Sequence, residues 1–540
     1  MVVPELRPWR AAKPHVVRLA DSVRPRLARA AAATKPQVAR LVRAGKPQVA
    51  RLARAGKPQV ARVTRPKAWQ YTAGAATAGL ALAAGVVTAA GPWDSSGQRT
   101  AERDRAVALG RAGGTDHGSV PGAPGRPRPA PSAGPVLTGL GGVSTVKSAP
   151  DGKALAGALD PLLKDPALGP RPAAAVVDVT TGRRLYGSGS GTGLTPASTT
   201  KIATAVAALS AMGADHRLTT RAALEPDTEE VVLVGGGDPT LTARENDRTG
   251  SASLRALAAE TAGALAERGV REVTLSYDTT LYAGDAMHPI GVNGNLALVS
   301  PLMADEGRTN DSTSGPVERV KDPAADAARR FGDLLESHGI KTTAPGLSKA
   351  TTRAETLATV SSPPLSALVE RMLTNSDNDI AEALARQTAI ATGNRADFAG
   401  AGKAIGSQLR KLGLPLKGAA FKDGSGLNRA DRLTPDLLTA LLAKAADPSH
   451  PELRPALTGL PVAGFTGTLT TRYADGASGV VRAKTGTLSG VHSLAGTLVD
   501  EDGRLLAFAF MATGTEAILP ATTQKALDRV ASALAACGCR

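Results

Sequence analysis

The amino-acid sequence predicts an α+β fold, in which helices cover an antiparallel sheet. Three strands in series are expected at 479–487, 493–500 and 504–512. A helix over 517–536 follows them, and strands in series covered by a helix are typical of this class. The chain has 540 residues, 42% of them hydrophobic, and this length exceeds what one hydrophobic core supports. We therefore expect more than one folded domain.

The first 67 residues are strongly basic, whereas the rest of the chain is nearly neutral. Residues 1–67 hold 17 Lys and Arg but only two acids, which accounts for nearly all of the net charge of +16. The hexapeptide Lys-Pro-Gln-Val-Ala-Arg recurs there every eleven residues, from Lys35, Lys46 and Lys57. This tail fits either a solvated basic arm or a segment lying on an anionic membrane. Because the folded part is neutral, a nucleic-acid partner is not expected.

Residues 72–91 contain no charged side chain. Twenty residues at 1.5 Å rise cover about 30 Å, the thickness of the hydrocarbon core of a bilayer. This stretch predicts a transmembrane helix, with the basic tail on the cytoplasmic side and the rest of the chain extracellular, so that the protein is a single-pass protein of the cell membrane. If the helix is cleaved off, the protein is secreted instead. Residues 94–147, rich in Pro and Gly, are expected to form a linker.

The folded part opens with two short strands around a Thr-Gly turn at 174–186, and a helix from Ser198 to Met212 comes next. Ser198 and Lys201 are three residues apart, so a helix places them on one face. A serine hydroxyl attacks a carbonyl when a neighbouring base accepts its proton, and lysine can be that base if burial or a second cation lowers its pKa. We therefore predict Ser198 as nucleophile and Lys201 as its base.

The same Ser-x-x-Lys spacing occurs once more, at Ser144 and Lys147, inside the predicted linker. Pro150 and Gly152 come directly after that copy, so no helix would hold its two side chains together. The spacing alone is therefore weak evidence, and the copy at Ser198 is favoured because an apolar helical run extends beyond it.

Two further motifs strengthen the prediction. Ser376-Asp377-Asn378 lies between two helices expected at 364–374 and 379–391, and Lys484-Thr485-Gly486-Thr487 lies on a strand. Ser376 can relay a proton to a leaving amine, and Asn378 can bind a substrate amide. Lys484 adds a positive charge, Thr485 and Thr487 can hold a carboxylate, and Gly486 would let a substrate backbone approach.

These three motifs, with Gly235–Leu241 and Asp423–Arg429, resemble those of penicillin-binding proteins over roughly 148–540. The similarity is to the low-molecular-mass class C D-alanyl-D-alanine carboxypeptidases and endopeptidases, the DacB-like family. It implies a β-lactamase/transpeptidase-like catalytic domain at 148–221 and 358–540. Smaller inserted domains are implied at 222–357, because about 175 residues separate Lys201 from Ser376.

The resemblance also implies the reaction. Ser198 would be acylated by the D-Ala-D-Ala end of a peptidoglycan stem peptide, D-alanine would leave, and water would free the shortened peptide. The oxyanion would lie between the backbone N–H groups of Ser198 and Thr487, and β-lactams would be covalent inhibitors. Whether the chain also acts as an endopeptidase is left open.

No metal or cofactor is expected, since the seven histidines lack paired ligand spacing and Gly235–Gly237 lacks a phosphate-loop frame. His492 is expected to be structural. A β-lactamase is one alternative, but class A enzymes use an extra glutamate to deacylate, and no glutamate lies between Ala383 and Pro451. A catalytically silent wall-binding or sensor protein is the other. The intact Ser198 and Lys201 argue against it.

Overall fold

The computed structural model describes residues 151–245, 250–473 and 476–538. The predictions for the basic tail at 1–67, the uncharged stretch at 72–91 and the linker at 94–147, which includes Ser144 and Lys147, fall outside these residues.

The described helices are too short to cross a bilayer. The longest of them, α14 (Pro520–Ala535), has 16 residues and so spans about 24 Å at 1.5 Å per residue. Within the described part of the chain no helix is long and apolar enough to span a membrane. This finding contradicts the predicted localisation, a single-pass membrane protein or its secreted form, which is withdrawn.

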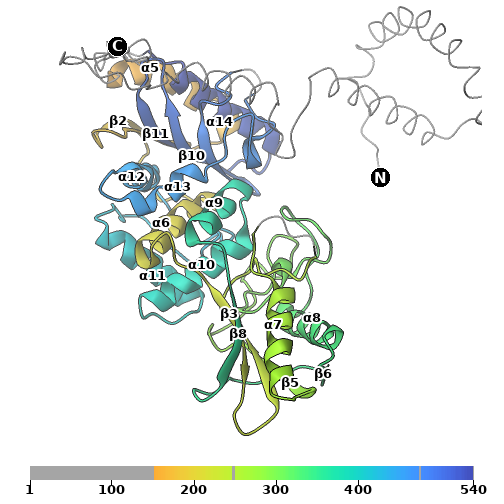
Figure 1. The fold of residues 1–540 in the computed structure, drawn as a ribbon. Helices are drawn as coiled ribbons and strands as arrows, with labels where there is room; N and C mark the ends of the chain where they lie inside the picture. The colour runs from red at the N-terminus through yellow and green to blue at the C-terminus, as the bar shows by residue number, and fades with distance from the viewer. Residues whose placement is uncertain (1–150, 246–249, 474–475, 539–540) are drawn as a thin grey trace, which may run out of the picture. The chain divides into compact units, whose positions relative to one another are not determined.

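The larger part of the fold is built on a five-stranded sheet, drawn at the top of Figure 1. Every neighbouring pair of strands in this sheet is antiparallel, in agreement with the predicted α+β class. In sheet order the strands are β2 (Arg184–Ser188), β1 (Ala173–Asp178), β11 (Leu505–Thr513), β10 (Val491–Val499) and β9 (Arg482–Leu488).

Helices cover both faces of this sheet. The helices α5 (Gly152–Leu163) and α14 contact each other on one face, and α12 (Pro435–Ala446) contacts β1 and β11 on the other. Along β11, Phe508 and Phe510 belong to the core shared with α14, whereas Ala507 and Ala509 belong to the core shared with α12. This alternation is the two-residue period of a strand with both faces buried.

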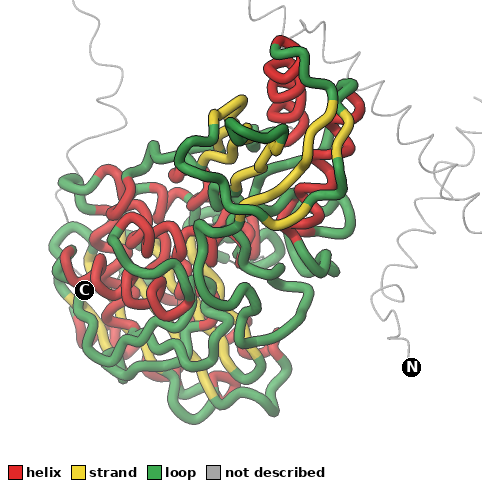
Figure 2. The backbone as a smooth tube through the Cα atoms, turned by 90° about the horizontal axis from the view of Figure 1, so that it is seen from below, coloured by secondary structure: helices red, strands yellow, loops and turns green. Residues whose placement is uncertain are grey.

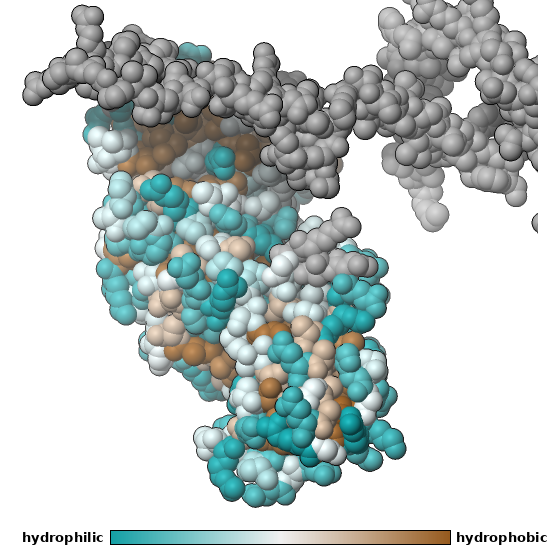
Figure 3. Space-filling model, in the orientation of Figure 1, coloured by the Kyte–Doolittle hydropathy of each residue, from teal (hydrophilic) through white to brown (hydrophobic). Residues whose placement is uncertain are grey.

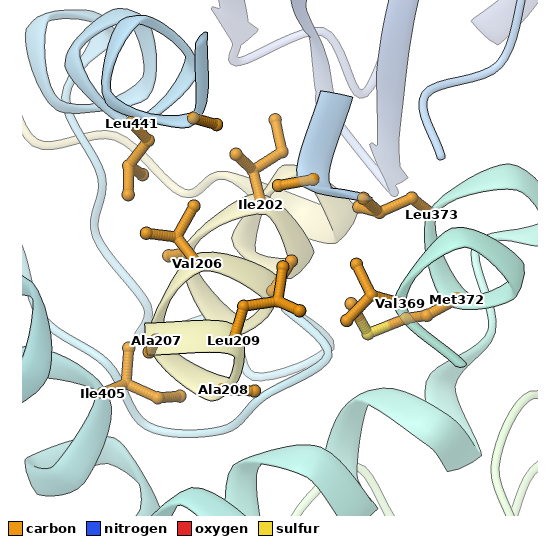
Figure 4. Close-up of a cluster of buried hydrophobic side chains, with 14 of the residues drawn as sticks. Ile202, Val206, Ala207, Ala208, Leu209, Val369, Met372, Leu373, Ile405 and Leu441 are labelled. Carbon is orange, nitrogen blue, oxygen red and sulfur yellow. The ribbon is translucent and has the colours of Figure 1, made fainter. Parts of the chain in front are cut away.

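The helix α6 (Thr200–Met212) runs through the middle of the helical layer. It contacts α9 (Leu365–Asn375), α10 (Asn378–Ala391), α11 (Phe398–Lys411) and the short α13 (Pro455–Thr458). Figure 4 shows Ile202, Val206 and Leu209 pointing into this core. Ala207 and Ala208 are fully buried, and their small side chains allow the neighbouring helices to approach closely. The start of α6 is thereby fixed in position.

A second sheet is formed entirely by residues between 219 and 361. In sheet order its strands are β6 (Lys341–Thr342), β5 (Glu272–Asp278), β4 (Glu230–Val234), β3 (Thr219–Leu224) and β8 (Glu355–Ser361), and β7 (Gly346–Leu347) pairs with β5. The helices α7 (Leu254–Glu267) and α8 (Pro323–Ser337) complete its own hydrophobic core. Figure 2 shows these strands lined by helices beside the helix-rich body. Hydrophilic side chains cover much of the face drawn in Figure 3, so the apolar ones lie mainly inside.

Of the predicted boundaries that differ from the structure, two lie next to the predicted site residues. The strand expected from 479 begins at Arg482, because Gly479 adopts a left-handed φ of 76° and the N–H of Val480 bonds back to the carbonyl of Ala477 in a turn. The helix expected from Ser198 begins at Thr200, because Ala197–Thr199 form a 3₁₀ turn instead. Ser198 therefore lies in that turn, immediately before α6.

Candidate functional site

Ser198 lines a cleft of about 470 Å³. The preceding residue, Ala197, has a φ of 48°, a left-handed conformation that is rare outside glycine and that persists only where the surroundings enforce it. Here the carbonyl of Pro196 is fixed by hydrogen bonds from the hydroxyls of Thr199 (2.8 Å) and Ser493 (2.6 Å). The turn therefore holds the Ser198 hydroxyl at the cleft.

Lys201 lies one helical turn further, fully buried beneath the cleft. Its Nζ donates to Ser198 Oγ at 3.1 Å, to Asn378 Oδ1 at 2.7 Å and to the carbonyl of Ser425 at 2.7 Å. Burial lowers the pKa of Lys201 to about 8, although the negative charge of Asp423 opposes the shift. A substantial fraction of Lys201 is therefore neutral at mildly alkaline pH.

Ser376 and Asn378 face Ser198 and Lys201 from the junction of α9 and α10. Ser376 ends α9 in a left-handed conformation with a φ of 59°. Asp377 begins α10 by accepting a hydrogen bond from the N–H of Ile380 at 3.0 Å, as residues preceding a helix commonly do. The Nδ2 of Asn378 donates to the carbonyl of Asn295 at 2.8 Å, so its Oδ1 points to Lys201.

The motif from Lys484 to Thr487 lies on β9, an edge strand of the first sheet. Lys484 is fully buried, and its Nζ donates to Ser376 Oγ at 2.9 Å. Burial, together with the positive charge of Lys201, holds the pKa of Lys484 well below its usual range. Thr485 and Thr487 line the cleft, and the hydroxyl of Thr485 donates to Thr468 at 3.0 Å.

Gly486 is placed differently from the sequence-based expectation. It does not line the cleft in the described structure, and a Cβ at this position would lie 2.1 Å from Ser493 Oγ and 2.6 Å from the carbonyl oxygen of Pro196. A glycine is needed here because β9 packs closely against the turn that holds Ser198.

Several residues that line the cleft were not predicted. We call residues 290–319 the wall segment, because it forms one side of the cleft. From it come Ile290, Asn295, Arg308, Ser314, Gly315, Pro316 and Arg319, and Thr468, Arg472 and Gln524 line the cleft from elsewhere. No motif marks these residues, and only the long spacing between Lys201 and Ser376 indicated that a further part of the chain had to be accommodated.

A buried polar layer lies behind Lys201. Glu382 accepts hydrogen bonds from the N–H groups of Gly424 (3.1 Å) and Ser425 (2.9 Å), which directs the carbonyl of Ser425 to Lys201. Asp423 accepts from His288 Nε2 at 2.9 Å, with His288 in its Nε2–H form. The loop that contacts Lys201 is therefore fixed from two sides.

Two groups among the described residues bring three candidate metal ligands together. They are His288, Glu382 and Asp423, and Glu306, Asp377 and Asp379. In the first group the ligand atoms are already engaged in the hydrogen bonds of the buried layer. In the second, arginines neutralise Glu306 and Asp379. A cation would have to displace these partners in either group.

His492 is buried and its Nδ1 lies 3.2 Å from the hydroxyl of Thr515, a partner within the core. Burial lowers its pKa, which keeps the ring neutral. The residue is structural, as expected.

Comparison with a protein-family model matches the D-Ala-D-Ala carboxypeptidase 3 (S13) family at residues 155–315 and 309–534. A carboxypeptidase of Mycobacterium tuberculosis is 34% identical over 429 residues, which cover 76% of this chain and 90% of that protein. A D-alanyl-D-alanine carboxypeptidase of an Actinomadura strain is 30% identical over 453 residues, covering 68% of this chain and 82% of the relative.

Among solved structures, penicillin binding protein 4 of Haemophilus influenzae aligns with a TM-score of 0.56 at 21% identity. The alignment covers 70% of this chain and 97% of that structure. At this identity the likeness is one of fold. A second structure of the same protein contains a bound β-lactam and aligns with a TM-score of 0.52.

Proposed function

Because the chain belongs to the D-Ala-D-Ala carboxypeptidase 3 (S13) family, we propose that its cleft removes the terminal D-alanine of peptides through an acyl-enzyme on Ser198. The family membership confirms the predicted resemblance, and the chain is a serine-type D-Ala-D-Ala carboxypeptidase, a hydrolase. The observation that carries the residue assignment is the 3.1 Å contact between Lys201 Nζ and Ser198 Oγ at the cleft.

Acylation begins with proton transfer from Ser198 to neutral Lys201, as Ser198 Oγ attacks the carbonyl of the penultimate D-alanine. The oxyanion is held by the backbone N–H groups of Ser198 and Thr487. The peptide C–N bond then breaks as Ser376, hydrogen-bonded to Lys484, passes its proton to the departing amine and regains one from protonated Lys201. Water hydrolyses the resulting ester, which releases the shortened peptide and restores Ser198.

The substrate we propose is the stem peptide of peptidoglycan. Thr485 and Thr487 line the cleft, where their hydroxyls can hold the terminal carboxylate. Since β9 is an edge strand, an extended peptide can align along it, with Asn378 binding the substrate amide. The same groups serve an endopeptidase, whose substrate carries a longer peptide in place of the single D-alanine that leaves.

We propose that β-lactams acylate Ser198 and leave slowly, which distinguishes the chain from a β-lactamase. Glu382 lies just before the stretch without glutamate, but it is 1% exposed and accepts hydrogen bonds from Gly424 and Ser425. It is therefore not free to activate a deacylating water. A silent sensor is disfavoured because both Ser–Lys contacts are intact.

The division into domains is also a proposal. The pairing of β3 with β8 brings the two ends of the second sheet together, which supports an inserted part between the two pieces of a β-lactamase/transpeptidase-like catalytic domain. The boundaries proposed at 222 and 357 fall inside those two strands. An insertion that contains both whole strands, from Thr219 to Ser361, fits the pairing better.

Intact mass after exposure to penicillin tests the assignment of Ser198. We expect one covalent adduct on the wild type and none on Ser198→Ala, with D-alanine released from a diacyl D-Ala-D-Ala peptide by the wild type alone. An adduct on Ser198→Ala would refute the assignment. Release of the penicillin adduct within seconds at pH 7 would favour the β-lactamase alternative.

A further inference from the structure

The junction between α9 and α10 is held by the wall segment as well as by its own helices. The Nδ2 of Asn378 donates to the carbonyl of Asn295 at 2.8 Å. The next residue, Asp379, accepts a hydrogen bond from the N–H of Ala297 at 2.9 Å and forms an ion pair with Arg319 at 2.8 Å. Two consecutive residues of the junction therefore take their position from a part of the chain about 80 residues earlier.

Asp377 is held through a chain of charges that ends on Glu306. One oxygen of Asp377 lies 3.9 Å from Arg371 Nη2, and that nitrogen also donates to Oε1 of Glu306. The other oxygen of Glu306, Oε2, accepts from Arg308 Nε at 2.7 Å. Arg308 in turn donates to the backbone carbonyls of Ser314 and Gly315, which line the cleft. Glu306 therefore connects the cleft wall to the loop that contains Ser376.

The backbone at Glu306 is constrained and its carboxyl group is buried. Burial raises the pKa of Glu306 to about 8, and the positive charge of Arg371 opposes this shift. Asp305 and Glu306 have φ values of 54° and 56°, in the left-handed region that side chains other than glycine rarely adopt. Such conformations persist where the surrounding structure over-determines them, and they cluster at functional sites. The side chains of Glu306 and Arg319 are 2% and 6% exposed, so loss of either would leave a buried charge without its partner.

We propose that Glu306 and Arg319 are positioning residues, which hold the loop from Ser376 to Asn378 in the geometry that acylation of Ser198 requires. The wall segment is thereby a working part of the active site, in addition to forming one side of the cleft. This inference rests on the proposed function, because it assigns the two residues to that reaction.

The test compares acylation by a fluorescent penicillin, together with kcat and KM for D-alanine release, in the full-length wild type, Glu306→Gln, Glu306→Asp and Arg319→Lys. Glu225→Gln is the matched control. Glu225 is another buried glutamate within 219–361, bonded to Thr351 and absent from the cleft lining. We expect Glu306→Gln to lower acylation and kcat about 10- to 100-fold, the cost of a displacement of about 1 Å, with KM altered less than about threefold.

Glu306→Asp keeps a carboxyl group and is expected to recover part of the loss, whereas Glu225→Gln should stay within about twofold of the wild type. A folded Glu306→Gln that acylates like the wild type overturns the inference, and so does an equal loss in the control. If thermal unfolding shows that Glu306→Gln does not fold, Arg319→Lys decides by the same criteria, since lysine keeps the charge but cannot reproduce the guanidinium geometry that places Nη1 2.8 Å from Asp379. Failure of the proposed function would appear separately, as a wild type without an adduct.

Discussion

Two Ser–Lys pairs lie at the cleft, and they differ in their surroundings more than in their contact distance. Lys201 lies 3.1 Å from Ser198, and Lys484 lies 2.9 Å from Ser376. Lys201 has two further acceptors, and the buried Asp423 and Glu382 oppose the effect of burial on its pKa, which settles near 8. At Lys484, burial and the charge of Lys201 act in the same direction.

This difference shows that contact distance does not determine the role of a lysine. Both amines lie within hydrogen-bond distance of a serine, but burial, opposed by the carboxylates behind it, sets the pH at which Lys201 becomes a base. At Lys484 no carboxylate among the described residues opposes the effect of burial on the pKa, and Ser376 and the carbonyl of Thr485 are its acceptors. Lys201 is therefore suited to accept the proton of Ser198 near pH 8, and Lys484 to hold Ser376 for the leaving group.

The largest expected effect separates the two lysines directly. Lys201→Met keeps most of the side-chain volume but removes the base, and we expect acylation by penicillin to fall about 10³-fold, within the range seen for loss of a general base. Stopped-flow fluorescence with a labelled penicillin measures this. If the variant acylates within about tenfold of the wild type at pH 8, another group accepts the proton of Ser198.

Lys484→Met is expected to cost less, about 10²-fold in kcat/KM for the diacyl D-Ala-D-Ala peptide, since it removes an electrostatic contact and the partner of Ser376 but leaves nucleophile and base in place. Steady-state release of D-alanine gives the value. A larger loss than in Lys201→Met at every pH would reverse the roles of the two pairs.

Asn378→Asp tests the electrostatic cause of the difference. The amide oxygen of Asn378 lies 2.7 Å from Lys201 Nζ, so a carboxylate there favours the charged form of the lysine and raises its pKa. We expect acylation at pH 7 to fall about tenfold and to recover part of the loss at higher pH, with the midpoint of the profile above that of the wild type. If the midpoint is unchanged and the acylation rate falls equally at every pH, Asn378 does not act through the pKa of Lys201.

The positions of side chains that depend only on neighbouring residues could be predicted from the sequence. Ser198 and Lys201 are one turn apart, and Asp377 starts a helix by its own side chain, so short-range rules place them. The order of the closing strands and of the helix after them was also predictable, because it depends on hydrophobic period and on turn residues.

The contacts that join distant segments were not predictable. Asn295 and Arg319 reach the site because a separate sheet carries the wall segment there, and Glu382 contacts the loop behind Lys201 through packing of α10. The close neighbours of Gly486 were not predictable for the same reason. They meet the glycine only when β9 pairs with β10 and the sheet packs against the turn before α6.

The smallest expected effect belongs to the wild type, whose acylation rate should track the neutral fraction of Lys201. The pKa of Lys201 is lowered to about 8, so the amine is mostly protonated at pH 7 and mostly neutral at pH 9. A base with this pKa gains activity about fivefold from pH 7 to 8 and less than about twofold from pH 8 to 9. Measured against Ser198→Ala as background, a rate that is flat over this range or falls as pH rises would show that deprotonation of Lys201 does not limit acylation, and the contrast between the two Ser–Lys pairs would lose its electrostatic basis.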